Sequence, residues 1–183
     1  MDAFTALPTL PPEQRWRGQT APVPVVVALI RRAAGPYTGQ WALVGGKWEF
    51  GETLPEAIVR EVAEETGLRT SFVAVRGVVS ERVAPWSAGT RGAHFLLLVC
   101  DLLVGDGEAT EQDEGVVAWF SYTAIDALSA AGEIIPSDYA MIREFAAATH
   151  CATHVEVEMR ALLDGTGEAL SEMIRFERLD GCW

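Results

Sequence analysis

GKWEFGETLPEAIVREVAEETGL, residues 46–68, carries a complete set of helix signals. Thr53 is a good N-cap, and Glu56 three residues later completes a capping box, in which each side chain accepts a bond from the other residue's backbone N–H. Gly67 can adopt the positive φ that commonly ends a helix. The stretch therefore predicts a helix from about Leu54 to Thr66.

Three glutamates border the apolar side of this helix. At 100° per residue, Glu61, Glu64 and Glu65 fall within an arc that overlaps the apolar stripe, which consists of Leu54, Ile58 and Val62. Like charges at i, i+3 and i+4 repel one another unless a cation lies among them, and Mg²⁺ or Mn²⁺ suits an all-oxygen ligand set. The alternative is a solvated surface helix held by ion pairs of Arg60 with Glu56 and Glu64.

The composition indicates a globular protein with an acidic surface. The chain has 183 residues, 49% of them hydrophobic and 22% charged, which suits one domain with an appendage. Its 14 basic and 26 acidic side chains give a net charge of −12, which argues against nonspecific binding to nucleic acid or to an anionic membrane. The three cysteines show no metal-ligand spacing, and their scarcity, with no basic-then-apolar leader, predicts a cytoplasmic protein.

Strand and helix patterns alternate irregularly outside residues 46–68. Residues 1–21 are rich in Pro and Thr and predict an irregular N-terminal arm. Short apolar runs predict strands at 25–30, 41–44, 72–80, 94–103 and 116–120. Two further helices are expected, at 125–131 and from a Ser137 cap to about residue 148. This order predicts an α/β fold with a mixed sheet and helices on both faces.

The tail, residues 149–183, has a different pattern. Residues 154–161 and 172–179 alternate with period two and flank the turn sequence DGTG at 164–167, which predicts a C-terminal β-hairpin extension. A lone hairpin is marginally stable in water. We therefore expect it to pack on the body or on a partner subunit, and a homodimer is the corresponding hypothesis.

The spacing of residues 46–68 resembles the Nudix box. Gly46 is followed after five residues by Glu52, and after seven more by REVAEETGL at 60–68, which fills every defining position of that motif. The resemblance covers roughly residues 22–148 and implies a Nudix hydrolase domain with an α/β/α sandwich. The expected organisation is thus an arm over 1–21, that domain over 22–148, and the hairpin extension over 149–183.

The box assigns roles to its own residues. Glu61 and Glu65, four residues apart, are the expected principal metal ligands, with Glu64 as a third ligand or a base. The resemblance agrees, and it implies that the Gly46 backbone carbonyl joins the metal shell. It also implies that Arg60 pairs with Glu52 to hold the loop against the helix, so both are assigned an orienting role in catalysis.

Further candidates lie outside the helix. In the acidic stretch 105–115, Glu114 is favoured over Glu111 and Asp113 as a general base or extra ligand; the alternative is a merely solvated loop. Lys47, the only lysine, would contact a phosphate or pair with Glu49. The substrate-binding candidates are Arg31, Lys47, Arg82 and Trp86. Arg91 is a further phosphate-contact candidate, and for each arginine the alternative is a surface charge. Trp86 or Phe120 could stack on a base, but core packing is expected for Phe120, as for His94 and Cys100.

The resemblance implies divalent-metal-dependent hydrolysis of a pyrophosphate bond in a nucleoside diphosphate linked to another group. The presence of a proline, Pro85, in the loop after the box resembles the ADP-ribose branch of the family. This resemblance favours ADP-ribose or a nucleotide sugar as substrate. The runner-up is a nucleoside triphosphate pyrophosphatase of the housecleaning type. A non-catalytic nucleotide-sensing module is the third possibility. Such modules often lack a box glutamate, whereas this chain has them all.

Overall fold

The computed structural model describes residues 2–9, 26–33, 37–83, 91–105, 109–110, 115–145, 151–163 and 169–179. Its elements in chain order are β1 (Asp2–Thr9), β2 (Val26–Arg32), β3 (Trp41–Leu43), β4 (Gly45–Lys47), α1 (Leu54–Thr66), β5 (Thr70–Val83), β6 (Ala93–Val104), β7 (Gly115–Ser121), α2 (Tyr122–Ala131), α3 (Pro136–Phe145), β8 (His154–Leu163) and β9 (Ala169–Leu179).

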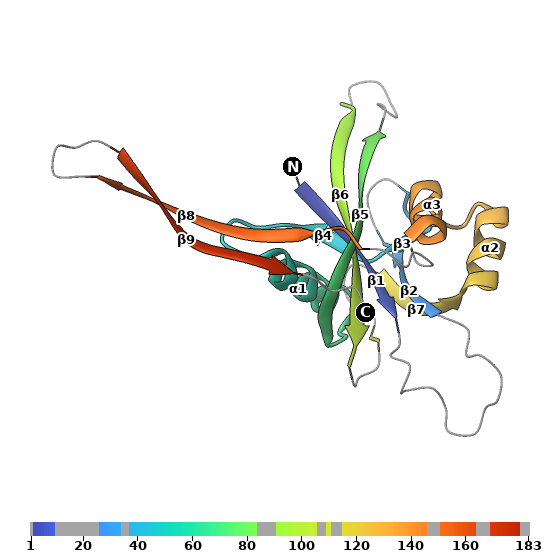
Figure 1. The fold of residues 1–183 in the computed structure, drawn as a ribbon. Helices are drawn as coiled ribbons and strands as arrows, with labels where there is room; N and C mark the ends of the chain where they lie inside the picture. Colours follow the sequence, from blue (N-terminus) through green and yellow to red (C-terminus); the bar gives the residue numbers. More distant parts are fainter. Residues whose placement is uncertain are drawn as a thin grey trace.

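Outside the C-terminal hairpin, the described residues form two sheets (Figure 1). The larger has the strand order β4-β1-β6-β5, in which β1 is parallel to β6 and the other neighbours are antiparallel. The smaller is antiparallel, with the order β3-β2-β7. The predicted mixed arrangement is therefore confirmed.

Residues 2–9 correct one prediction, because they form β1 rather than part of an irregular arm. β1 lies between β4 and β6, with Phe4 opposite both Gly46 and Leu98. Pro8 is tolerated because β4 pairs only with residues 3–5, so at Pro8 the strand has β6 as its described neighbour. The composition of this segment predicted a loop. The strands that hydrogen-bond to β1 lie some 40 and 90 residues further along the chain, so the local sequence does not reveal them.

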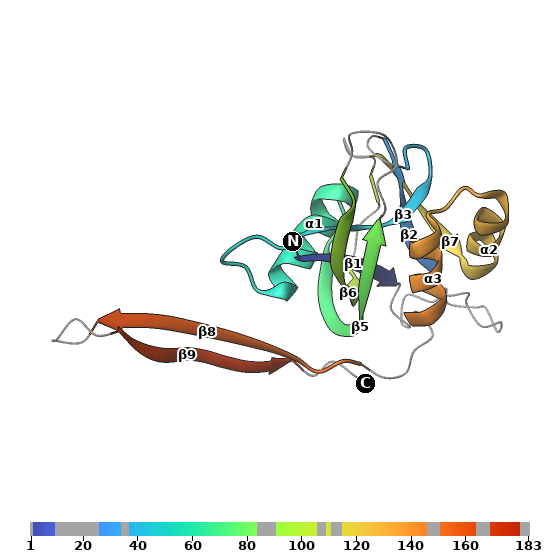
Figure 2. The same cartoon turned by 90° about the horizontal axis from the view of Figure 1, so that it is seen from above.

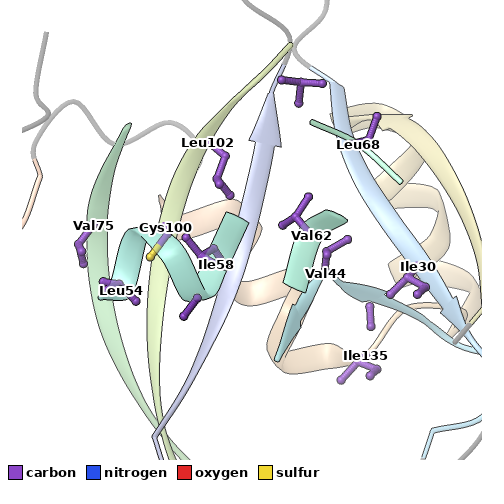
Figure 3. Close-up of a cluster of buried hydrophobic side chains, with 13 residues drawn as sticks. Ile30, Val44, Leu54, Ile58, Val62, Leu68, Val75, Cys100, Leu102 and Ile135 are labelled. Carbon is purple, nitrogen blue, oxygen red and sulfur yellow. The ribbon is translucent and has the colours of Figure 1, made fainter. Parts of the chain in front are cut away.

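Helices cover both sides of the sheets, as the predicted α/β/α sandwich requires (Figure 2). One core cluster packs α1 against β5 and β6, and its labelled members include Ile58, Val62, Val75 and Leu102 (Figure 3). A second cluster packs α2 and α3 against the other side and contains Leu29, Ile125 and Ile142. β2 contributes to both clusters because its side chains alternate, as the uniformly apolar run at 25–30 indicates.

The predicted bounds and caps of α1 are confirmed. Thr53 Oγ1 accepts from the Glu56 amide, the Glu56 carboxylate accepts from the Thr53 amide at 2.8 Å, and Gly67 ends the helix at φ 71°. Leu54, Ile58 and Val62 have no exposed surface. The period of the apolar residues therefore determines which face of α1 is buried.

Other elements differ from their predictions at the ends. β5 is longer than residues 72–80, and its register shifts around Gly77, where the Phe145 ring packs so closely that a Cβ would lie 2.3 Å from it. Ser137 lies inside α3 and is not its cap, since the helix begins at Pro136. The expected end of that helix at residue 148 lies outside the described residues.

The three expected core residues have different outcomes. Cys100 is a buried free thiol, and burial raises its pKa to about 12. Phe120 packs edge-on against Trp41, with ring centroids 4.7 Å apart. The core role predicted for His94 is wrong, because its exposed ring contacts Ser80 Oγ at 2.6 Å. His94 stands near the end of the β5–β6 pair, where an apolar neighbourhood in sequence does not imply burial.

The predicted C-terminal hairpin is confirmed by antiparallel pairing of β8 with β9. It extends well beyond the body in both views (Figures 1 and 2). Val157, Ile174 and Phe176 are exposed on it. The described residues contain no helix long and apolar enough to cross a bilayer.

Asp138 in the first turn of α3 predicts a pH effect on stability. Burial is the largest cause that raises its pKa from 3.8 to about 6, while Oδ2 accepts the Leu43 amide at 2.8 Å. Between about pH 4 and 6 the folded state binds the extra proton, so this group's contribution to the free energy of unfolding falls as pH rises. Asp138→Asn keeps an acceptor for Leu43. We expect it to gain stability relative to the wild type between pH 4.5 and 7.5 in urea unfolding; a constant difference would contradict the assignment.

Candidate functional site

The glutamates of α1 are held on the backbone of β4. Glu65 Oε2 accepts the Gly45 amide at 3.0 Å, and Glu61 Oε1 accepts the Lys47 amide at 3.0 Å. Four residues of helix rise about 6 Å. Two residues of strand rise about 6.6 Å, and their N–H groups point the same way. These two distances are similar. Two carboxylates that are one turn apart on α1 can therefore each accept a hydrogen bond from one of two N–H groups that are two residues apart on β4.

Gly46 lies between these two amides, and its lack of a side chain is what admits Glu61. A Cβ at Gly46 would lie 2.1 Å from Glu61 Cδ and 2.2 Å from Oε2. Real Cβ atoms essentially never approach another heavy atom that closely. The carboxylate of Glu61 therefore occupies the space above the Gly46 backbone.

Arg60 joins the loop before α1 to the glutamates on it. Its Nε and Nη2 donate to Oε1 and Oε2 of Glu52 at 2.6 and 2.9 Å, a bidentate pair. Its Nη2 also donates to the Lys47 carbonyl at 3.2 Å, and Nη1 lies 3.1 Å from both Glu61 Oε1 and Glu64 Oε2. The hydrogen bond to Arg60 lowers the pKa of Glu52, and that to Glu52 raises the pKa of Arg60. At neutral pH, Glu52 is therefore negatively charged and Arg60 is positively charged.

The surface-helix alternative accounts for only part of this arrangement. The Arg60–Glu64 pair that it expects is present, but Glu56 bonds Thr53. Arg60 also spans from the helix to Glu52 and the Lys47 carbonyl, which a solvated face does not require. The geometry therefore favours a built site over a charged surface.

The donor set suits a hard divalent cation. The carboxylates of Glu61, Glu64 and Glu65 and the Gly46 carbonyl offer only oxygen ligands, which is the donor type that these cations prefer. Among the described residues, no three His, Cys, Asp or Glu side chains already form a ligand group. Glu61 and Glu65 bond backbone amides, and Glu64, 58% exposed, bonds Arg60. For these carboxylates to bind one cation together, some of these hydrogen bonds and ion pairs would have to be replaced by bonds to the cation.

Apart from Lys47, the remaining predicted residues lie away from the box or outside the described residues. Arg31 on β2 donates from Nε to the Gly39 carbonyl at 2.9 Å and so contacts the turn at 37–40. Lys47 is exposed on β4, next to the glutamates. Arg82 is exposed near the carboxyl end of β5, which Figure 1 shows projecting away from α1. Trp86 and Glu114, like Glu111 and Asp113, lie outside the described residues.

Sequence reasoning missed three residues that contact the box. The Trp48 indole N–H donates to the Glu52 carbonyl at 2.9 Å, the Glu156 carboxylate accepts the Leu54 amide at 2.8 Å, and His154 bonds Glu156. Trp48 lies within the box itself, at a position that the motif leaves open. His154 and Glu156 carry no local signal, because they lie about a hundred residues further along the chain.

Comparison with known proteins gives the family. A NUDIX domain model matches residues 16–145, so the chain belongs to the NUDIX domain family. A Methanocaldococcus jannaschii protein named ADP-ribose pyrophosphatase is 37% identical over 114 residues, which cover 62% of this chain and 64% of that protein. Nucleoside triphosphatase NudI of Enterobacter sp. (strain 638) is 34% identical over 99 residues, covering 51% of this chain and 70% of that protein.

A solved structure supports the fold. The MutT protein of Bacillus halodurans superposes with a TM-score of 0.60 at 17% identity, covering 97% of this chain and 96% of that one. At this identity the likeness concerns the fold alone.

Proposed function

We propose that this chain is a divalent-metal-dependent pyrophosphohydrolase acting on a nucleoside diphosphate linked to another group. The observation that carries the proposal is that Glu61 and Glu65 accept hydrogen bonds from the amides of Lys47 and Gly45. Gly46 lies between these amides, at a position where a side chain would strike Glu61. Membership of the NUDIX family supports the same conclusion. A purely structural role would leave this carboxylate arrangement unexplained.

The residues of the box would divide the work. Glu61, Glu65, Glu64 and the Gly46 carbonyl would hold Mg²⁺ or Mn²⁺, which supplies charge neutralisation and a bound water of lowered pKa. The Arg60–Glu52 pair orients the loop against α1. Glu64, the most exposed of the three glutamates on α1, is available to accept a proton from an attacking water, a role that Glu114 shares as a candidate. Because the net charge is −12, an anionic substrate depends on the cation and on a few basic groups.

We infer that the substrate is ADP-ribose or a nucleotide sugar. The M. jannaschii relative named ADP-ribose pyrophosphatase supports this choice. The Enterobacter relative named nucleoside triphosphatase supports the runner-up, a nucleoside triphosphate pyrophosphatase. Lys47, exposed beside the glutamates, is the proposed phosphate contact nearest to them, and Arg31, Arg82 and Trp86 stay proposals as further contacts.

A turnover screen tests the function. The purified chain is assayed with Mg²⁺ and Mn²⁺ against ADP-ribose, nucleotide sugars, dinucleoside polyphosphates and nucleoside triphosphates, with EDTA as the metal-free control. We expect hydrolysis of one compound well above the rest and none in EDTA. No turnover across the panel, with intact cation binding, would contradict the enzyme and favour the nucleotide-sensing module.

Glu114→Gln tests the proposed general base. The substitution removes a charge and keeps the shape, so we expect the turnover number to fall at least tenfold, as is usual when a general base is lost. Glu64→Gln and Glu111→Gln are measured beside it. An unchanged rate in Glu114→Gln would transfer the role to whichever of those two residues shows the loss.

The remaining proposals concern the setting of the protein. A homodimer through the C-terminal hairpin is supported by the exposed apolar residues Val157, Ile174 and Phe176, and a monomeric mass by light scattering would refute it. A cytoplasmic location stays a prediction from the low cysteine content.

A further inference from the structure

We propose that Glu156 and His154, at the base of the C-terminal hairpin, are positioning residues that fix the loop at 48–53 and the first turn of α1. We refer to the pair as the hairpin clamp. The inference rests on the proposed function only in its catalytic consequence, because the clamp itself consists of contacts that can be measured without turnover.

The first contact joins the hairpin to the start of α1. Glu156 Oε1 accepts the Leu54 amide at 2.8 Å, and Leu54 is the first residue of the helix. The first four amides of a helix have no partner inside it. The capping box supplies an acceptor for the Glu56 amide, and Glu156 supplies one for the Leu54 amide. A carboxylate is favoured at this end because the helix dipole is positive there.

The second contact joins the hairpin to the loop. His154 Nε2 lies 2.8 Å from Glu156 Oε1, and its ring lies 6.4 Å from that of Trp48, between centroids. Trp48 in turn donates to the Glu52 carbonyl, and the Glu52 carboxylate binds Arg60. A continuous series of contacts therefore runs from the hairpin to the guanidinium that touches Glu61 and Glu64.

Three observations indicate that these contacts matter to the loop. The side chains of His154 and Glu156 are only 14% and 13% exposed, although Val157 and Glu158, which follow them on β8, are exposed. The loop itself is exposed at Glu49, Phe50 and Gly51, so Trp48 and Glu52 provide its described anchoring contacts. Upstream, the Ala152 amide donates to the Val75 carbonyl at 2.8 Å and ties the same segment to β5. The clamp thus holds both the loop and the helix start from one side.

The test uses Glu156→Ala, the conservative Glu156→Gln, and Glu158→Ala as a matched control. Glu158 lies two residues further along β8, on the same face of the hairpin, and is exposed. The first readout is hydrogen exchange of the Leu54 amide, with the β6 amides as a reference for global opening. The second is Mn²⁺ binding by the full chain, measured by titration calorimetry with the metal alone. The third is the split of kcat and KM on the best substrate of the screen.

We expect Glu156→Ala to accelerate exchange of the Leu54 amide about tenfold relative to β6, since a charge-assisted bond is lost. Mn²⁺ affinity and kcat should fall severalfold with KM changed less. Glu156→Gln, which retains an acceptor oxygen, should recover most of each effect, and Glu158→Ala should match the wild type. Equal acceleration at Leu54 and β6, unchanged Leu54 exchange, or an equal effect of Glu158→Ala would overturn the clamp. If the wild type turns over no substrate, the proposed function fails, while the exchange measurement still decides the clamp.

Discussion

Glu65→Gln is expected to reduce turnover with Mg²⁺ by on the order of a thousandfold, the scale seen when a charge-stabilising group is removed from an active site. The fold should persist, because the glutamine side-chain oxygen can still accept the Gly45 amide that Glu65 Oε2 accepts at 3.0 Å. The substitution removes only the negative charge, which is the property that a divalent cation requires of this ligand.

The measurement compares steady-state rates and melting temperatures of the wild type, Glu65→Gln and Glu144→Gln. Glu144 is exposed on α3, so its substitution makes the same charge change away from the box. Full activity of Glu65→Gln with Mg²⁺ would show that the metal assignment is wrong. Equal losses in both variants would instead point to a general effect of net charge.

Gly46→Ala is expected to lower turnover at least a hundredfold, the second of the two large effects. The new Cβ would lie 2.1 Å from Glu61 Cδ, so the Glu61 carboxylate must leave its place above the Gly46 backbone. That displacement breaks its bonds to the Lys47 amide and to Arg60 and removes a proposed metal ligand. Stability should fall by about 1–3 kcal/mol, as is typical of overpacking.

Two controls isolate this clash. Gly105→Ala adds the same methyl group where the nearest contact is the Arg69 carbonyl at 3.4 Å, and it should leave turnover unchanged. The double variant Gly46→Ala/Glu61→Ala removes the group that the methyl strikes. It should recover the stability lost in Gly46→Ala, measured by urea unfolding, while remaining inactive. Wild-type turnover in Gly46→Ala would show that Glu61 need not lie over Gly46.

The local parts of the structure could be predicted because their causes are local. The Thr53–Glu56 capping box, the apolar stripe of α1 and Gly67 define a helix whose observed bounds match the prediction. The apolar run at 25–30 predicted a buried strand, and residues 27–30 of β2 are buried. The alternation in the tail predicted the hairpin. The box also brought Arg60 into contact with Glu52, Glu61 and Glu64, since its spacing is that of a loop followed by one helix face.

Tertiary structure decided what depends on partners distant in the chain. Residues 2–9 form a strand because β4 and β6 supply its hydrogen bonds, which a Pro- and Thr-rich composition does not reveal. Only the packing of α1 on β4 shows that Glu61 occupies the space left by Gly46. The attachment of the hairpin through Glu156 likewise depends on a contact across 102 residues. The sequence by itself determined the helix and the side of it on which the carboxylates lie, because periodicity and capping act within a few residues. The fold alone determined what holds that helix in place, because those contacts exist only once distant segments have packed together.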